Sequence, residues 1–334
     1  MDNGVRHKVE FANGPFKNLF LAFIAYKVAS GLKYEDSCQY TMRIINRQLN
    51  QMGIAEGRLE KGVVETLAAK RPNESLETQK KRISLLREFG KYLNRMGYDA
   101  YIMPNASKGQ SIKSFAPYIF SDEEMRRIFQ ASDTLPPLCR YPHYHLVYPV
   151  LVRMLYSCGL RVTEALHIRY RDIDLTAGSL YIDNGKNWRS RVVPMSDSMT
   201  QVCAEYIERR FGGVIGEDQF IFQAPDGNCY SRGSVRCTVK TIYRNAGIPL
   251  LSNGQYPRVH DLRHGFCVRS MIKMQQAGMD LYCMLPLLSK FVGHKGLRET
   301  ELYLRLPQMA FNEVALSIQD AMGGLFPEVC HESE

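Results

Sequence analysis

The chain has 334 residues, of which 45% are hydrophobic and 23% charged, and its formal net charge is +9; this is an ordinary composition for a soluble globular protein. No apolar run approaches the roughly 20 residues of a membrane span, and residues 18–32, broken by Lys27, predict a core helix and not a signal peptide. The nine cysteines, an odd number without a C-x-x-C pair, argue against a disulfide framework and for a reducing, cytoplasmic setting.

The positive charge is concentrated in the first third of the chain. Residues 1–120 carry 19 Lys and Arg against 11 Asp and Glu, whereas residues 121–334 carry 24 against 23. A basic first third predicts a polyanionic partner, with nucleic acid foremost. A solvated basic surface is the alternative, and the charge alone does not decide between them.

Residues 15–100 predict helices, the clearest of which begins near Leu76. Apolar residues recur there at helical spacing, at Leu76, Ile83, Leu86, Phe89 and Leu93. Such a helix can pack by its apolar stripe and meet DNA phosphates by its basic face, although an ordinary amphipathic helix is the alternative. The basic residues on the remaining faces are Lys80, Lys81, Arg82, Arg87, Lys91 and Arg95.

A segment without periodicity separates two predicted domains. Residues 103–117 are rich in Ser, Gly, Pro and Lys, which predicts a linker at 106–118 between domains 1–105 and 119–334. A fresh helix is predicted to begin at Ser121, with Glu124 as its capping-box partner.

The second domain is predicted to combine helices with a small sheet. An apolar helix ends near Gly159, two short strands within 179–196 flank a polar turn that contains Lys186, and helices dominate from 198 to 323. The predicted fold class is therefore mainly α, with a small antiparallel β-sheet in an α+β second domain that follows a helical first domain.

Two cationic side chains of the second domain lie at predicted turns. Arg161 follows a glycine where one helix ends and another begins, so it is placed to hold an anion, and pairing with Glu164 is the alternative. Lys186 at the hairpin tip can give up a proton when its pKa falls, and a solvated turn lysine is the alternative.

Histidines and one tyrosine complete the set of candidates. His260 and Arg263 are spaced i, i+3 and share a helix face, which suits proton transfer at a phosphate. His264 is expected to pack or hydrogen-bond behind them. His294 follows a glycine, and Tyr303 comes nine residues later. Each residue taken alone has an ordinary structural interpretation.

The order and spacing of these motifs resemble the tyrosine recombinases, the phage-integrase family. The resemblance rests on GLRVTEAL, GKNWRSRVVPM, HDLRH, LSKFVGH and TELYLRL, covers roughly residues 119–307, and extends more loosely to residues 15–100, which resemble the family's core-binding domain. The sequence departs from the family at Gly265, where a small hydroxyl residue is frequent, and at Asn187, where a second glycine is common.

The resemblance implies a role for each motif in cutting and rejoining DNA. Tyr303 is expected to attack the scissile phosphodiester and form a 3′-phosphotyrosyl link, while Arg161 and Arg263 grip the non-bridging oxygens. Lys186 is expected to protonate the leaving 5′-oxygen. The covalent link conserves the energy of the phosphodiester, so strands can rejoin without ATP.

The histidines and the cations together imply chemistry without a metal or another cofactor. His260 is expected to help deprotonate the tyrosine, and His294 to donate a hydrogen bond to the phosphate. Asp172 and Asp174 are expected to cap the turn into the first strand and not to hold two metals. A zinc site is conceivable where a cysteine and two histidines lie within seven residues, but no second pair matches them: Cys139, His143 and His145.

The resemblance also implies partners. The chain is expected to bind double-stranded DNA at a specific site as a tetramer, with accessory DNA-bending or directionality proteins, for integration or excision of a mobile element. An apolar stripe at Val314, Ile318 and Met322 is a candidate for exchange between protomers. The alternatives are a catalytically silent DNA-binding regulator on the same fold, a type IB topoisomerase-like activity, and a metal-dependent nuclease.

Overall fold

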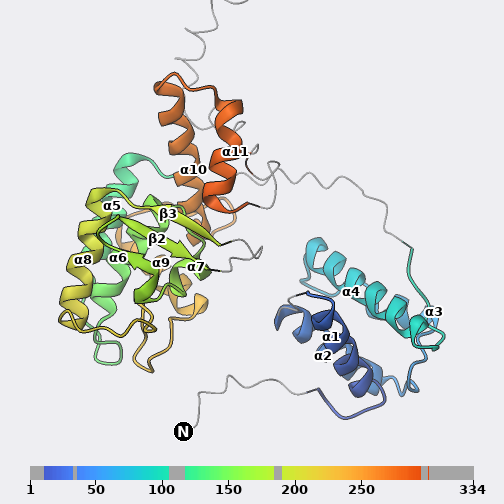
Figure 1. The fold of residues 1–334 in the computed structure, drawn as a ribbon. Helices are drawn as coiled ribbons and strands as arrows, with labels where there is room; N and C mark the ends of the chain where they lie inside the picture. Colours follow the sequence, from blue (N-terminus) through green and yellow to red (C-terminus); the bar gives the residue numbers. More distant parts are fainter. Residues whose placement is uncertain (1–10, 33–35, 105–116, 184–189, 295–299, 301–334) are drawn as a thin grey trace, which may run out of the picture. The chain divides into compact units, whose positions relative to one another are not determined.

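The structure, a computed structural model, describes residues 11–32, 36–104, 117–183, 190–294 and 300. The chain divides into two compact units, Met1–Ile112 and Lys113–Glu334 (Figure 1). The predicted fold class is confirmed, because the described elements are helices and one small antiparallel sheet. None of the helices within the described ranges is long and apolar enough to cross a membrane. Most of the predicted linker lies outside the described residues.

The first unit packs its helices around an aromatic core. Phe20 stacks on Phe89 with ring centroids 4.2 Å apart, and Phe23 meets the same ring edge-on at 5.4 Å. All three rings are buried, so the first helix is fixed against the fourth. The helices are α1 (Lys17–Ala29), α2 (Asp36–Gln51), α3 (Lys61–Ala68) and α4 (Leu76–Arg95).

The buried side of α4 differs in part from the predicted stripe. Leu86, Phe89 and Leu93 are buried as predicted, whereas Leu76 is 52% exposed. The prediction that Arg82 lies on the basic, DNA-facing side is wrong, because its side chain is only 2% exposed. Arg82 precedes Leu86 by four residues and therefore lies on the same side of the helix.

The buried position of Arg82 is stable because the neighbouring loop supplies its acceptors. Its Nε and Nη2 donate to the two carboxylate oxygens of Glu74, at 3.2 and 2.6 Å. Its Nη groups also donate to the backbone carbonyls of Leu67 and Ala69. Arg82 therefore holds the loop that connects α3 to α4.

The second unit is built around α6 (Tyr144–Ser157), which is buried along most of its length. The remaining elements are α5 (Asp122–Asp133), α7 (Val162–Leu166), the 3-10 helix η1 (Tyr170–Asp172), α8 (Asp197–Phe211), α9 (Arg232–Asn245), α10 (Val259–Gln276) and α11 (Leu281–Val292). The capping box predicted at the start of α5 is confirmed: Ser121 Oγ accepts from the Glu124 N–H at 3.1 Å, and Glu124 accepts from the Ser121 N–H at 2.9 Å.

The sheet has three antiparallel strands in sequence order, β1 (Ile173–Asp174), β2 (Ser179–Ile182) and β3 (Arg191–Pro194). The predicted pair of strands is confirmed, with Leu180 opposite Val193 on the buried face. The short β1 was not predicted. Asp174 caps the turn into β2 by accepting from two backbone N–H groups, as expected. The turn between β2 and β3, including Lys186, lies outside the described residues.

Candidate active site

Arg161 lies at the start of α7, just after a sharp reversal of the chain. Gly159 makes that reversal with φ +60°, and a Cβ there would meet the Phe266 ring at 2.4 Å, so the position requires glycine. The ion pair considered as the structural alternative is present, because Arg161 Nη1 donates to Glu164 Oε1 at 2.8 Å. The Arg161 side chain is nevertheless 16% exposed.

Glu164 is the carboxylate that three arginines share. It accepts from Arg161, and it accepts from both Nη groups of Arg191, at 3.2 and 2.9 Å. Arg263 Nη1 lies 3.7 Å from its Oε2. Burial would raise the pKa of Glu164, but the hydrogen bonds and charges of Arg191 and Arg161 outweigh burial and lower it to about 2. Three guanidiniums and one carboxylate give these four side chains a combined charge of +2.

The end of α11 accepts from the same three arginines. The last carbonyls of a helix have no acceptor role within the helix and carry the negative end of its dipole, so cations stabilise them. Gly293 ends α11 with φ +67°. The contacts are Arg191 Nε to the Phe291 carbonyl at 2.7 Å, Arg263 Nη2 to the Val292 carbonyl at 2.5 Å, and Arg161 Nη2 to the Gly293 carbonyl at 2.7 Å.

Arg263 and two histidines come from the first turns of α10. Arg263 is 1% exposed and also donates to the Gly159 carbonyl at 2.8 Å. The rings of His260 and His264 meet edge to face at 4.8 Å, so His264 packs behind the site as expected. His260 is exposed, but desolvation, His264 and Arg263 lower its pKa below the ordinary value. Burial, Arg258 and Arg263 lower the pKa of His264 to about 4.

His294 directly follows the glycine that ends α11. Its Nδ1 lies 2.8 Å from the Thr300 hydroxyl oxygen. Burial and the charges of Arg263 and Arg161 lower the pKa of His294 to about 3. The structure therefore gathers four of the predicted catalytic residues: Arg161, His260, Arg263 and His294. The other two, Lys186 and Tyr303, lie outside the described residues.

Two residues of this site were not predicted, Arg191 and Thr300. Arg191 pairs with the buried Ile182 across the sheet and shares a strand face with buried Val193. An arginine on the inward face of a short strand must find a buried acceptor, so the period-2 pattern contains the signal that could have found it. Thr300 carries no such signal, because its role depends on the fold around His294.

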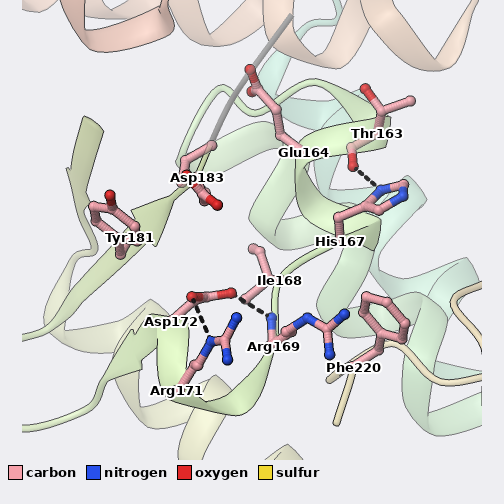
Figure 2. Close-up of a pocket in the computed structure, with 11 residues that line it drawn as sticks. Thr163, Glu164, His167, Ile168, Arg169, Arg171, Asp172, Tyr181, Asp183 and Phe220 are labelled. Carbon is pink, nitrogen blue, oxygen red and sulfur yellow. Dashed lines mark hydrogen bonds and ion pairs between the residues drawn. The ribbon is translucent and has the colours of Figure 1, made fainter. Parts of the chain in front are cut away.

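Glu164 also lines a cavity of about 460 Å³, together with residues of η1 and β2 (Figure 2). Its polar groups bind one another: His167 Nδ1 lies 2.7 Å from the Thr163 carbonyl, and Asp172 accepts from the Arg169 N–H at 2.8 Å. Among the described residues, none of the predicted catalytic ones, Arg161, His260, Arg263 and His294, lines this cavity. We therefore place the candidate active site at the end of α11.

The residues expected to contact DNA or a metal ion differ in their exposure and arrangement. Lys80, Lys81 and Lys91 are exposed on α4, whereas Arg87 is half-buried and donates to the carbonyl of Met103. Within the described ranges no group of three or more His, Cys, Asp or Glu is arranged to hold a metal ion, and that includes the segment with Cys139, His143 and His145.

Comparisons with known proteins identify relatives of this chain in sequence and in fold. A model described as "Phage integrase family" matches residues 119–309. The chain is 29% identical over 228 residues to a candidate integrase/recombinase of Sinorhizobium fredii, y4rB, covering 67% of this chain and 72% of that protein. It is 24% identical over 254 residues to the tyrosine recombinase XerC of Oceanobacillus iheyensis, covering 73% and 75%. Among solved structures, the XerH site-specific recombinase bound to difH substrate has the same fold, with a TM-score of 0.60 at 18% identity over 93% of this chain and 85% of that one.

Proposed function

Because this chain belongs to the phage integrase family of tyrosine recombinases, we propose that it is a site-specific DNA recombinase acting through a 3′-phosphotyrosyl intermediate. One observation carries the proposal. Arg161, Arg263 and His294 come from three different parts of the second unit and meet where α11 ends. Such a meeting of cations and a neutral histidine suits a phosphodiester.

The charge of the cluster fits a DNA phosphate. A phosphodiester carries one negative charge, and more charge builds on its oxygens during transfer. Glu164 and the three arginines around it carry a combined charge of +2, so a bound phosphate brings the site toward neutrality. Arg161 and Arg263 remain charged at every working pH and can each offer two parallel N–H groups to the non-bridging oxygens.

Tyr303 and Lys186 supply the bond exchange in this proposal. The Tyr303 oxygen forms a bond to phosphorus while the bond from phosphorus to the 5′-oxygen breaks. Lys186 gives a proton to the leaving 5′-oxygen, which becomes a hydroxyl. A 5′-hydroxyl from another strand then attacks the phosphotyrosyl bond and restores both the phosphodiester and the tyrosine. No metal and no ATP enters either step.

The histidines suit two different hydrogen-bonding roles. The lowered pKa of His260 keeps its ring neutral near pH 7, so it can accept the proton of Tyr303. If the Thr300 hydroxyl donates to His294 Nδ1, then His294 carries its proton on Nε2 and can donate it to the phosphate. The role of His260 requires a neutral ring, and the neutral form is the one that the surrounding arginines favour for both histidines.

The first unit and the C-terminal segment would organise DNA and protomers. We assign DNA backbone contacts to Lys80, Lys81 and Lys91 of a core-binding domain over residues 1–105, and catalysis to residues 119–334. Exchange of two duplexes needs four cleavages, hence four protomers, which the stripe within 311–322 would link. Accessory DNA-bending or directionality proteins and a mobile element as the target complete the proposal.

Covalent capture tests the proposal and identifies the DNA site in one experiment. The protein is expressed in its native host, the cells are lysed in denaturing detergent with chelator, and any DNA still attached is sequenced. The normal protein and Tyr282→Phe, a change at a 77% exposed tyrosine of α11, should retain DNA through a 3′ end at one or a few sequences. Tyr303→Phe should retain none.

Other outcomes point to the alternatives. If no protein retains DNA under conditions where a known recombinase does, the regulator is favoured. Covalent DNA at many unrelated sequences, together with relaxation of supercoiled plasmid, indicates a type IB topoisomerase-like activity. Cleavage that is lost in chelator indicates a metal-dependent nuclease.

A further inference from the structure

Arg191 occupies a central position in the site, although Lys186 is the only residue of its motif, GKNWRSRVVPM, with an expected catalytic role. Its side chain is 11% exposed. Each of its three nitrogens donates to a protein acceptor: Nε to the Phe291 carbonyl at 2.7 Å, and Nη1 and Nη2 to the two oxygens of Glu164. Arg191 therefore joins strand β3, helix α7 and the end of helix α11.

Arg191 and Arg161 both bind Glu164 and the end of α11. Arg161 Nη1 donates to Glu164, and Arg161 Nη2 donates to the Gly293 carbonyl at the end of α11. The plane of the Arg161 guanidinium is set by these two acceptors. Arg191 binds Glu164 and the Phe291 carbonyl, which lies two residues before Gly293. It therefore fixes the positions of both acceptors of Arg161.

The fit around Arg191 leaves little freedom. A Cβ at Gly293 would lie 2.8 Å from Arg191 Nη1 and 3.1 Å from its Cζ. The glycine therefore serves two purposes, since it adopts φ +67° and it lets the guanidinium approach the helix end. A lysine has one nitrogen on a flexible stem and cannot reach Glu164 and Phe291 together in the same fork.

We propose that Arg191 is a positioning residue for the strand-cleavage reaction, acting through Glu164 and the end of α11 to aim Arg161 at the scissile phosphate. This inference rests on the recombinase function proposed above. Arg191 does not contact the phosphate in this proposal. Its effect is on the geometry of a group that does, and such groups are sensitive to misplacement by an ångström.

The test compares arginine-to-lysine substitutions in single-turnover cleavage. The substrate is a duplex of the site recovered by covalent capture, nicked near the scissile phosphate so that the released strand diffuses away. Arg191→Lys should form the covalent complex about 100-fold more slowly, with DNA affinity changed less than about threefold. The matched control is Arg153→Lys, because Arg153 also makes two hydrogen bonds to a carboxylate, that of Asp133 at 2.7 Å each; its rate should be normal.

A double substitution separates positioning from general weakening of the fold. If Arg191 acts through Arg161, then Arg161→Lys with Arg191→Lys should be no slower than Arg161→Lys alone. A purely structural role predicts that the two losses multiply. Multiplying losses, or normal cleavage by Arg191→Lys, would overturn the inference.

Two further outcomes of the cleavage experiment also decide the inference. If Arg191→Lys melts below the assay temperature, Arg191→Gln with Glu164→Gln removes both charges together and avoids a buried unpaired carboxylate. That protein should show the same 100-fold loss, and normal cleavage by it would overturn the inference. If the unsubstituted protein forms no covalent complex, the recombinase proposal fails first and this inference fails with it.

Discussion

The two units of this chain both bury arginine, and they do so for different ends. In the first unit Arg82 has one carboxylate of its own, Glu74, and two backbone carbonyls, so the pair is electrically balanced. In the second unit three arginines share Glu164 and the last carbonyls of one helix, which leaves an excess of positive charge. The balanced pair of Arg82 and Glu74 fixes a loop. The excess positive charge around Glu164 suits the binding of an anion.

The difference follows from the cost of burying charge. A buried ion without a partner costs several kcal/mol, and a pair with hydrogen bonds recovers most of that cost. The second unit tolerates its excess because the α11 carbonyls offer partial negative charge to each arginine. A bound phosphodiester would then reduce the remaining charge of these side chains from +2 to +1.

The largest expected effect comes from removing the shared carboxylate. Glu164→Ala should destabilise the second unit by about 5 kcal/mol, because three buried or half-buried guanidiniums lose their common partner. The first unit should be unaffected. Hydrogen exchange with peptide mass spectrometry over a denaturant series on the whole chain reads the two units separately.

A matched surface carboxylate provides the control for Glu164. Asp133 pairs with Arg153 but is 48% exposed, so Asp133→Ala should cost about 1 kcal/mol or less. If Glu164→Ala lowers the free energy of unfolding of the second unit no more than Asp133→Ala does, the shared carboxylate is not what holds the arginines. The comparison between the units then fails.

The corresponding change in the first unit should be smaller and confined to that unit. Arg82→Ala leaves Glu74 without its main partner and should cost about 3 kcal/mol. Replacing both partners, as in Arg82→Met with Glu74→Leu, should cost far less because no charge is left alone. The same exchange experiment measures both, and equal losses from the single and double variants would contradict the balanced-pair account.

Acidification should affect the units differently. The folded-state pKa of His264 is lowered to about 4 from 6.5, so its contribution to stability is present above pH 6.5 and is lost as pH falls toward 4. Between pH 6.5 and 4.5 His264 alone should cost the second unit about 2 kcal/mol, and His260 and His294, whose pKa values are also lowered, should add to that loss. Residues 11–32 and 36–104 contain no histidine, so the first unit should stay level. His264→Gln should make the profile less steep by its own share, and parallel losses in both units would contradict this.

Much of the fold follows from local sequence patterns. The capping box at Ser121, the helix that ends before Gly159 and the alternating pattern of Leu180 and Val193 were all predictable, because each depends on residues a few positions apart. The two-residue strand β1 escaped prediction because it is too short to show a period.

The site was predictable only where motifs name its residues. Arg161, Arg263 and His294 could be found from their order along the chain. The strand pattern could have marked Arg191 as inward-facing, but its role could not be assigned, because its acceptors on α7 and at the end of α11 lie 27 and 100 residues away in sequence. Arg82 was assigned to the wrong face for a different reason: its spacing from Leu86 indicated the buried side, but the acceptors that allow its charge to be buried there were not predicted. Helical spacing shows which side of a helix a residue occupies, but not whether a distant loop satisfies its charge.

The smallest expected effect separates the exposed lysines of α4 from the buried Arg82 on the same helix. Lys80→Gln should leave stability unchanged within about 0.5 kcal/mol, because Lys80 is exposed. If Lys80 meets a DNA phosphate, the slope of log affinity against log salt should fall by about one, since one fewer counterion is released on binding. Lys61→Gln, at a 68% exposed lysine of α3, is the control and should leave the slope unchanged. An unchanged slope for Lys80→Gln would mean that the basic face of α4 is only solvated, and the first unit would then have to bind DNA through another surface.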